Sequence, residues 1–401
     1  MLEGWRFPAL SDVATFVSGG TPNKATPEFW DGDIPWVTVS DMKSLRLTDA
    51  QYKLTPAGAS QVRMVEKGTI LVLVRGMGLF KDLPILLCED PLTFNQDIKG
   101  LIPNSGIDSE YLAYALIARK SEILRHVDSA GHGTGRLDTD LLKSTPVPLP
   151  PLPEQRRIAE ILGTWDEAIE KLEALRAANI KRRVWFRTHL FTGRARLASF
   201  SGEWREVALG EVLTEHGSKA TGAEEVFSVS VHKGLINQVE HLGRSFAAAD
   251  TAHYSRVLPG DIVYTKSPTG DFPLGIIKQS KIDPEVIVSP LYGVFTPMTY
   301  ALGVILDALF ESPLAVRNYL TPLVQKGAKN TIAITNTRFL EGKLRLPMDP
   351  AEQAAIADVV STSNAELAAI DREITALQRQ KRGLMQKLLT GEWRVSKEVL
   401  D

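Results

Sequence analysis

The sequence contains a single cysteine and no long apolar run. Cys88 is the one cysteine among 401 residues, so we expect no disulfide framework and no thiolate zinc cluster, and a reducing compartment. The first residues, MLEGWRFPALSDV, lack the basic and apolar regions of a secretory signal. No apolar run approaches the roughly 20 residues that a membrane-spanning helix needs. We therefore expect the chain to work in the cytoplasm.

Motifs of catalysis are missing as well. The seven histidines show neither His-x-x-x-His nor His-Glu-x-x-His spacing, which argues against a zinc centre. The glycine-rich run at 131–135 lacks the Gly-Lys-Ser/Thr ending of a phosphate-binding loop. The sequence also has no Asn-Pro-Pro-Phe/Tyr motif, which an adenine methyltransferase would need. We therefore predict no catalytic residue and no metal in this chain, and leave any chemistry to a partner.

The charges are balanced overall but not locally. The formal net charge of −2 gives no global sign of a nucleic-acid partner. Between Arg176 and Arg196, however, the sequence has seven arginines and lysines and no acid. Such a run is typical of a solvated helix face, and it is also what a polyanion would bind. The sequence leaves both interpretations open.

The two halves of the chain repeat one plan. Trp5 matches Trp204 at a shift of 199 residues, and Glu154-Gln155 matches Glu352-Gln353 at a shift of 198. Between them, KGTIL at 67–71 matches PGDIV at 259–263 at a shift of 192. The shift changes through these mixed segments and is constant along the segments after them, which indicates insertions in loops.

Each half predicts strands and a helix without a sustained strand–helix alternation. In the first half we expect strands at 36–40 and 69–75 and a helix over 108–127, capped by Asp108 or Ser109. In the second half we expect strands at 226–230 and 261–265 and a helix over 303–310. This composition predicts mixed α+β domains.

Two long heptad patterns come after the mixed segments. Along 158–190, and again along 356–388, apolar residues alternate at spacings of four and three, which predicts a coiled coil. Arg176, Asn179 and Arg183 interrupt the first pattern, and such polar residues can fix the register of a coiled coil at a cost in stability. An antiparallel pair about 55 Å long, at about 1.5 Å per residue, would serve as a ruler between two domains or as a dimerisation rod. Both roles stay open.

Proline-rich segments at 146–153 and 346–350 mark the ends of the mixed domains. Proline disfavours a helix interior, and each segment is followed by a predicted helix with a glutamate in its first turn, which suits the helix dipole. The chain is therefore expected to divide into a first mixed domain (1–153), a central long helix (154–200), a second mixed domain (201–351) and a C-terminal long helix (352–401).

Several of these motifs resemble one known family. The run PLPPLPEQRRIAEIL at 148–162 looks like the start of the central helical region of type I restriction-modification specificity subunits. Leu-Phe-Thr-Gly at 190–193 and Leu-Leu-Thr-Gly at 388–391 resemble the ends of that family's helices. SGGTP at 18–22 and FWDGDIPWV at 29–37 resemble its target-recognition domains. The resemblance covers essentially the whole chain, although the second half lacks the Gly-Thr-Pro and Ile-Pro-Trp runs.

The resemblance implies a fold and a function. The fold would be α+β, with two mixed target-recognition domains joined by two long helices that form an antiparallel coiled coil in a pseudo-two-fold repeat. Each recognition domain would read one half of a bipartite double-stranded DNA target. The helices would set the gap and dock two modification (methylase) subunits, which carry S-adenosylmethionine, and restriction (motor-nuclease) subunits, which carry ATP and Mg. This chain would hold no cofactor, perform no catalysis and work in a prokaryotic cytoplasm.

Candidate DNA contacts can be chosen from the requirements of base reading. Bases are read by donors and acceptors in a groove, whereas contacts to phosphate position the protein. We expect such groups on glycine-relieved loops at 131–137 and 327–334 and on cations that end matched strands, while Trp5 and Trp204 should lie in cores. The candidates of the first domain are Lys24, Arg75, Lys81, Asn95, His132, Thr134 and Arg136. Those of the second are Lys219, His232, Lys233, Lys266, Lys329, Asn330, Thr331 and Asn336.

Two other interpretations differ in their partners. A stand-alone DNA-binding regulator or decoy specificity protein would bind DNA without methylase subunits, so co-purification separates it from the first interpretation. A coiled-coil adaptor without nucleic acid would bind its partners independently of DNA. Phosphate contacts, in contrast, give binding a steep dependence on salt.

Overall fold

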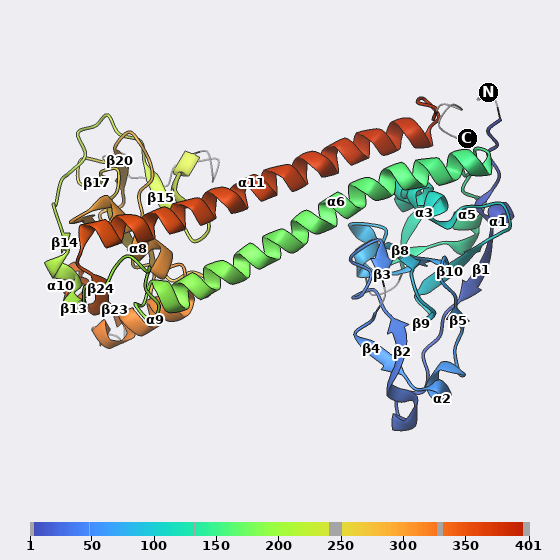
Figure 1. Ribbon diagram of the computed structural model, residues 1–401, viewed down its shortest axis with the longest axis horizontal. Coiled ribbons are helices and arrows are strands. Elements are labelled where there is room, and N and C mark those ends of the chain that lie inside the picture. Colours follow the sequence, from blue (N-terminus) through green and yellow to red (C-terminus); the bar gives the residue numbers. More distant parts are fainter. Residues whose placement is uncertain (1–3, 48, 131–132, 240–250, 327–331, 396–401) are drawn as a thin grey trace. The chain divides into compact units, whose positions relative to one another are not determined.

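The structure, a computed structural model, describes residues 4–47, 49–130, 133–239, 251–326 and 332–395. The chain divides into two compact units. Unit 1 comprises Met1–Leu172 and Glu373–Asp401, and unit 2 comprises Glu173–Arg372. The division falls inside both long helices, α6 (Leu152–Trp185) and α11 (Pro350–Leu389), so each unit contains one part of each helix (Figure 1).

Unit 1 is built on a five-stranded sheet in the order β1-β10-β6-β8-β3. The strands are β1 (Ala14–Ser18), β10 (Ile98–Pro103), β6 (Ile70–Leu73), β8 (Ile85–Cys88) and β3 (Arg46–Leu47). All neighbours are antiparallel except β3 and β8. Every residue of β6 and β8 is buried, which explains their continuous apolar runs. The sheet and α3 (Ser109–Ala118) share one hydrophobic core.

Two smaller sheets complete unit 1. One has the order β4-β2-β9-β5, with β4 (Tyr52–Leu54), β2 (Trp30–Val37), β9 (Leu92–Phe94) and β5 (Met64–Val65). The other has the order β11-β12-β7, with β11 (Val127–Ala130), β12 (Thr134–Leu137) and β7 (Arg75–Gly76). The short helices are α1 (Leu10–Val13), α2 (Pro56–Ala59), α4 (Lys120–Ile123), α5 (Thr139–Ser144) and the 3-10 turns η1 (Pro27–Phe29), η2 (Met77–Phe80) and η3 (Leu124–His126).

Unit 2 repeats this plan. Its four-stranded sheet has the order β14-β21-β18-β19, all antiparallel, and α8 (Tyr300–Leu309) joins its core. The strands are β14 (Leu213–Thr214), β21 (Gly293–Pro297), β18 (Ile262–Thr265) and β19 (Ile276–Gln279). This order reproduces β1-β10-β6-β8, and α8 takes the place of α3 in the chain. The internal repeat and the α+β class predicted from the sequence are confirmed.

The remaining elements of unit 2 are paired strands and short helices. The strand pairs are β13 (Trp204–Ala208) with β24 (Lys343–Pro347), β15 (Phe227–Ser230) with β16 (Gly234–Asn237), β17 (Ser255–Val257) with β20 (Val286–Val288), and β22 (Gln325–Lys326) with β23 (Ile332–Ala333). The helices are α9 (Pro313–Leu320), α10 (Asn336–Glu341), the 3-10 turns η6 (Leu209–Glu211) and η7 (Thr321–Leu323), and a π-helical turn after α6, Phe186–Leu190.

Several predicted boundaries were wrong for local reasons. The helix expected over 108–127 begins after Asp108, whose carboxylate accepts a hydrogen bond from the Tyr111 amide at 2.9 Å, but α3 ends at Ala118. Two short turns come next, and Val127 already pairs in β11. The strand expected at 36–40 ends at Val37, because the Asp41 carboxylate accepts a hydrogen bond from the Thr38 amide at 2.8 Å and folds the chain into a turn.

The proline-rich segment and the predicted loops also differ from expectation. Helix α6 begins at Leu152, so Pro153 lies in its first turn, where a missing N–H breaks no helical hydrogen bond. Residues 134–137 form strand β12 of a hairpin rather than a loop, and residues 332–333 form β23. The backbone of β12 is paired on both sides, with β11 and β7, so its side chains are the groups left to contact a partner.

Within each unit the two long helices are paired, as the heptad patterns predict. In unit 1 Lys381 of α11 donates to Asp166 of α6. In unit 2 Arg176 of α6 pairs with Asp371 of α11 at 2.5 Å, and Arg182 pairs with Glu366. In unit 2 residues farther along α6 therefore meet residues earlier in α11, which is the antiparallel order.

In each unit a glutamate at the start of a long helix accepts two hydrogen bonds from an arginine. In unit 2 the buried Glu352 receives two hydrogen bonds from Arg196, at 2.6 and 2.8 Å, and one from the Trp204 indole at 3.1 Å. In unit 1 Glu154 receives two hydrogen bonds from Arg394, at 2.8 and 2.9 Å. Trp5 and Trp204 are both buried, as predicted, and the paired arginine lies over the ring in each case.

The glutamine of each repeated Glu-Gln pair fastens the segment before its helix. Gln155 donates to the carbonyl of Pro150 at 2.8 Å and accepts from the Asp108 amide at 2.9 Å. Gln353 donates to the carbonyl of Pro347, also at 2.8 Å. The constant shift of the repeat along the helices thus coincides with these buried contacts.

Among the described ranges, no helix has both the length and the apolar character needed to cross a membrane.

Candidate nucleic-acid interface

Two arginines lie opposite each other on neighbouring strands of the three-stranded sheet in unit 1. Arg75 of β7 is the register partner of Arg136 of β12, and both side chains are exposed. Neither side chain makes a hydrogen bond or ion pair to another residue in the described part of the chain. Like charges directly opposite each other destabilise a sheet. The pair therefore suits an anion that would lie between or above the two guanidinium groups, and phosphate accepts such contacts.

The face that carries the two arginines is polar along its length. Thr134 lies two residues before Arg136 on β12 and so shares its face, while the intervening Gly135 and the following Leu137 are buried. Asp138 comes next, and its pKa is held below the usual range because its carboxylate accepts the amides of Asp140 and Leu141, with a smaller pull from Arg136. Asp138 is thus used as the cap of α5.

Lys24 and Asn95 lie at a hollow of about 520 Å³ in the same unit. Three aromatic residues, Trp30, Trp36 and Tyr52, also line it. The Asn95 side-chain oxygen accepts the Asp97 amide at 3.1 Å. The carbonyl of Asp97 in turn accepts the amides of Val74 and Arg75, at 2.9 and 3.2 Å. The hollow is therefore joined through the backbone to the start of β7. Lys81, exposed, lies directly after η2.

The structure brings the described candidates of unit 1 onto connected elements. Arg75, Thr134 and Arg136 share one small sheet, Lys81 lies at the end of the turn after β7, and Lys24 and Asn95 line the adjoining hollow. His132 lies outside the described residues. These positions agree with the role predicted for them, and that role itself stays a prediction.

The candidates of unit 2 lie on separate elements. Lys266 directly follows β18, whereas Arg75 lies two residues beyond β6 and begins β7, so the two cations follow matched strands rather than end them. His232 and Lys233 lie in the turn between β15 and β16, where His232 lines a hollow of about 880 Å³. Lys219 bridges to Ser255 of β17. Lys329, Asn330 and Thr331 lie outside the described residues.

Asn336 and Lys266 are both influenced by one carboxylate. The Asn336 amide donates to Glu215 at 2.6 Å, so this side chain already has a structural partner at the start of α10. Partial desolvation lowers the pKa of the Lys266 ammonium, and the Glu215 carboxylate opposes that shift. Of these two candidates, Lys266 is the better placed to contact an anion.

The basic run from Arg176 to Arg196 is largely neutralised inside unit 2. Five of its seven cations form ion pairs with acids from elsewhere in the chain: Arg176 with Asp371, Arg182 with Glu366, Arg183 and Arg187 with Glu311, and Arg196 with Glu352. The sequence leaves a solvated face and a polyanion surface open. The ion pairs favour neither the solvated face nor the polyanion surface, because these arginines bind acids that lie on other elements of unit 2.

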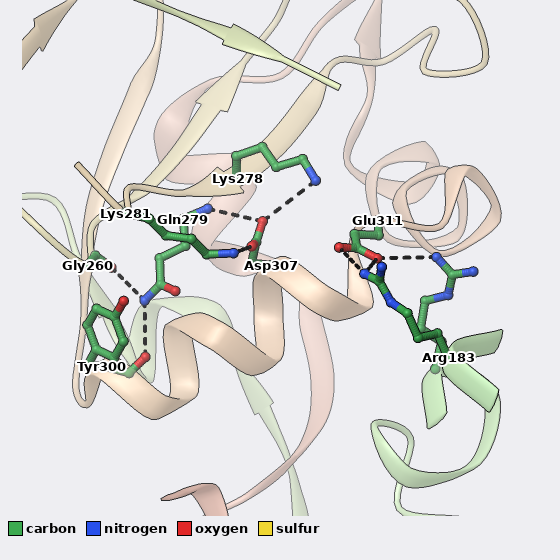
Figure 2. A network of polar contacts seen from close by, with 9 residues as sticks. Arg183, Gly260, Lys278, Gln279, Lys281, Tyr300, Asp307 and Glu311 are labelled. Carbon is green, nitrogen blue, oxygen red and sulfur yellow. Dashed lines mark hydrogen bonds and ion pairs between the residues drawn. The ribbon is translucent and has the colours of Figure 1, made fainter. Parts of the chain in front are cut away.

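Asp307 in α8 and Glu311, just beyond the end of α8, bind the cations of neighbouring elements, as Figure 2 shows. Glu311 receives both hydrogen bonds of Arg183 at 2.9 Å. One turn earlier, the buried Asp307 pairs with Lys281 at 2.8 Å and lies 3.8 Å from Lys278. The helix that covers the sheet of unit 2 is thus tied on one side to β19 and the segment after it, and on the other side to α6.

Sequence reasoning missed two features of unit 1. The aromatic hollow combines residues from separate strands and loops, which no single motif reveals. The turn η2 exposes Met77 and Phe80, and a short apolar segment beside a buried strand is ordinarily assigned to the core. An alternation of apolar side chains with Gly76 and Gly78 was the available signal for a tight turn.

Comparison with known proteins agrees with this architecture. The family described as type I restriction modification DNA specificity domain matches residues 2–182. A specificity subunit of an Escherichia coli type I restriction enzyme is 34% identical over 160 residues. Over these residues the chain is similar to type I restriction-modification specificity subunits. The match to the E. coli protein covers 39% of this chain and 40% of the relative's length.

Longer matches extend over the second half at lower identity. A specificity subunit from Methanocaldococcus jannaschii is 23% identical over 98% of this chain and 94% of its own length. The crystal structure of a type I restriction-modification S subunit from M. genitalium matches with a TM-score of 0.60 and 17% identity, covering 96% of both chains. This likeness shows that the fold of both units is shared.

Proposed function

We propose that the chain gives a type I restriction-modification enzyme its DNA specificity. In this proposal each mixed unit reads one half of a bipartite double-stranded target. One observation carries the contact with DNA: Arg75 and Arg136 lie opposite each other on β7 and β12, and neither forms an ion pair among the described residues. Most cations of the basic run, which could be mistaken for such a site, are paired with acids.

The two long helices are proposed to set the unread gap and to dock partner subunits. Both helices continue without a break from one unit into the other, so a change in their length must change the frame that both units share. We propose two modification subunits carrying S-adenosylmethionine as partners, joined by restriction subunits carrying ATP and Mg. This chain would hold no cofactor and perform no chemistry itself.

The Arg136→Ala variant tests the DNA contact. We expect it to weaken binding to duplex DNA and to lower the slope of log K against log salt by about 1, because one phosphate contact is lost. Lys143→Ala is a matched control, since Lys143 is already paired with Asp140 at 2.9 Å. Co-purification with modification subunits should be unchanged in both variants. Wild-type protection of the target by the Arg136 variant in a methylation assay would rule out this role.

A further inference from the structure

The turn η2 presents two apolar side chains between cations. Met77 is 73% exposed and Phe80 is 54% exposed, whereas Leu79 between them is buried in the core. Arg75 precedes the turn and Lys81 comes directly after it, both exposed. Single exposed apolar residues are common on protein surfaces and need no explanation. Two of them on one turn, bracketed by cations without a counter-ion among the described residues, are a less common combination.

The turn is held firmly in place by its neighbours. Leu79 packs so closely on β12 that a Cβ added to Gly135 would lie 3.1 Å from the Cβ of Leu79. The Gly78 carbonyl accepts the amides of Lys81 and Asp82, at 2.9 and 3.0 Å. The Asp82 carboxylate then pairs with Lys120 of α4 at 3.0 Å. The packing of this turn is done by Leu79, so Met77 and Phe80 are not needed to anchor it.

The matched turn of unit 2 has no such pair among its described residues. After β18 the residues Lys266–Gly270 and Asp271 are exposed, and they are polar apart from Pro268 and Gly270. The first large apolar side chain is Phe272, which is buried. The two units therefore share a cation after a matched strand and differ in the turn beyond that cation. If the exposed apolar pair served the framework, both units should have it. If it served to read one half-site, only one unit should have it.

We propose that Met77 and Phe80 are apolar contacts to bases in the half-site read by unit 1, an inference that rests on the proposed function. Arg75, Arg136 and Lys81 bring phosphate groups to this surface, and the two side chains then lie against the bases, where apolar groups contact thymine methyls or an opened base step. Charge favours DNA over a protein partner as the occupant, because Arg75, Lys81 and Arg136 form no ion pair in the described part of unit 1, although Asp128 lies opposite Arg136 on β11. The matched turn of unit 2 contacts its half-site through polar groups.

The test compares the Met77→Ala, Phe80→Ala double variant with unaltered protein. The target is first found by mapping methylated adenines in the source genome, and duplexes are then made with the full target or with one half-site scrambled. The full chain, assembled with its modification subunits, is titrated with each duplex at several salt concentrations. Phe7→Ala is the matched control, because Phe7 is 52% exposed in the same unit, on a segment whose neighbour Arg6 bridges to Leu149.

We expect the double variant to bind the full target about tenfold to a hundredfold more weakly, as loss of buried apolar contacts predicts. The salt slope should stay unchanged, unlike that of Arg136→Ala, and discrimination should be lost at one half-site only. Binding equal to that of the unaltered protein, equal losses at both half-sites, or a loosened complex with unchanged DNA affinity would each overturn the inference. If the unaltered complex shows no preference for the target, the proposed function itself fails, which separates the two outcomes.

Discussion

Replacing Glu352 with alanine should destabilise unit 2 strongly. Its carboxylate is nearly inaccessible and accepts two hydrogen bonds from Arg196 and one from the buried Trp204 indole. The change leaves a charge without its partner and an indole N–H without an acceptor. Breaking a buried pair costs about 3–5 kcal/mol, but Arg196 keeps 26% of its side-chain surface in water and also donates to the Gly202 carbonyl. We therefore expect a loss of about 3 kcal/mol, at the low end of that range because solvent can partly replace the lost carboxylate.

The measurement must resolve the two units, because a chain with two compact units need not unfold in one step. For a unit of this size a loss of about 3 kcal/mol lowers the unfolding midpoint by roughly 6–12 °C. Hydrogen exchange measured by mass spectrometry would place the loss on the peptides around Trp204 and the start of α11. Peptides of the sheet in unit 1 should keep their protection. A midpoint shift below about 2 °C, well under the expected range, or equal loss of protection in both units, would refute the reasoning.

Two matched variants give the expected order of effects. Glu154→Ala removes the equivalent contact in unit 1, but Arg394 is 41% exposed and the Trp5 indole nitrogen has no hydrogen-bond partner among the described residues. Its cost should therefore be smaller than that of Glu352→Ala. Glu160→Ala removes an exposed pair with Arg157 on α6, and exposed pairs contribute about 0–1 kcal/mol. Any other order would mean that burial does not determine what these glutamates contribute.

Two further predictions concern the helices and the core. Deleting one heptad, Ile169–Leu175, should change the gap of the methylated target or prevent assembly, and an unchanged recognition sequence would exclude a ruler. Burial raises the pKa of the Cys88 thiol to about 12, so the native chain should resist alkylation at about pH 8 to 9, near the ordinary thiol pKa, while the unfolded chain reacts. Because the folded pKa lies above the ordinary 9.0, the stability from this group is complete below that value and is lost as pH rises toward about 12; rapid alkylation of native protein would contradict this.

Local patterns were sufficient to predict the framework from the sequence. The apolar runs of β6 and β18 mark buried strands, because both faces of these strands are covered. The heptads of α6 and α11 predict their pairing, since only a facing helix can bury such a seam. Asp108 predicts the start of α3 because an aspartate before an apolar helical run commonly caps it. Each of these signals needs only residues close together in the chain.

Contacts between distant residues could not be predicted in this way. Arg183 and Glu311 are 128 residues apart, so nothing in the basic run shows that its charges are neutralised. The pairing of Arg75 with Arg136 likewise depends on the register of two short strands, and neither strand has an alternation long enough to reveal its faces. Surface cations can therefore be predicted from the sequence in some cases, while their neighbours become known only from the fold.

The repeat separates contacts that must stay equal from contacts that can differ. Glu154 and Glu352 occupy equivalent positions, and in both units the partner is an arginine that lies beyond the end of a long helix and covers a tryptophan. Lys381 and Arg183 are also 198 residues apart in the sequence, yet Lys381 binds Asp166 and lies over the Tyr114 ring, whereas Arg183 binds Glu311. The first contact involves the helices and the segments that lead into and out of them, so changing it would alter a frame common to both units. The second contact joins α11 to α6 and covers Tyr114 of α3 in unit 1, whereas in unit 2 it joins α6 to the segment after α8. This polar pair can therefore differ between the units while each mixed domain acquires a different DNA-reading surface.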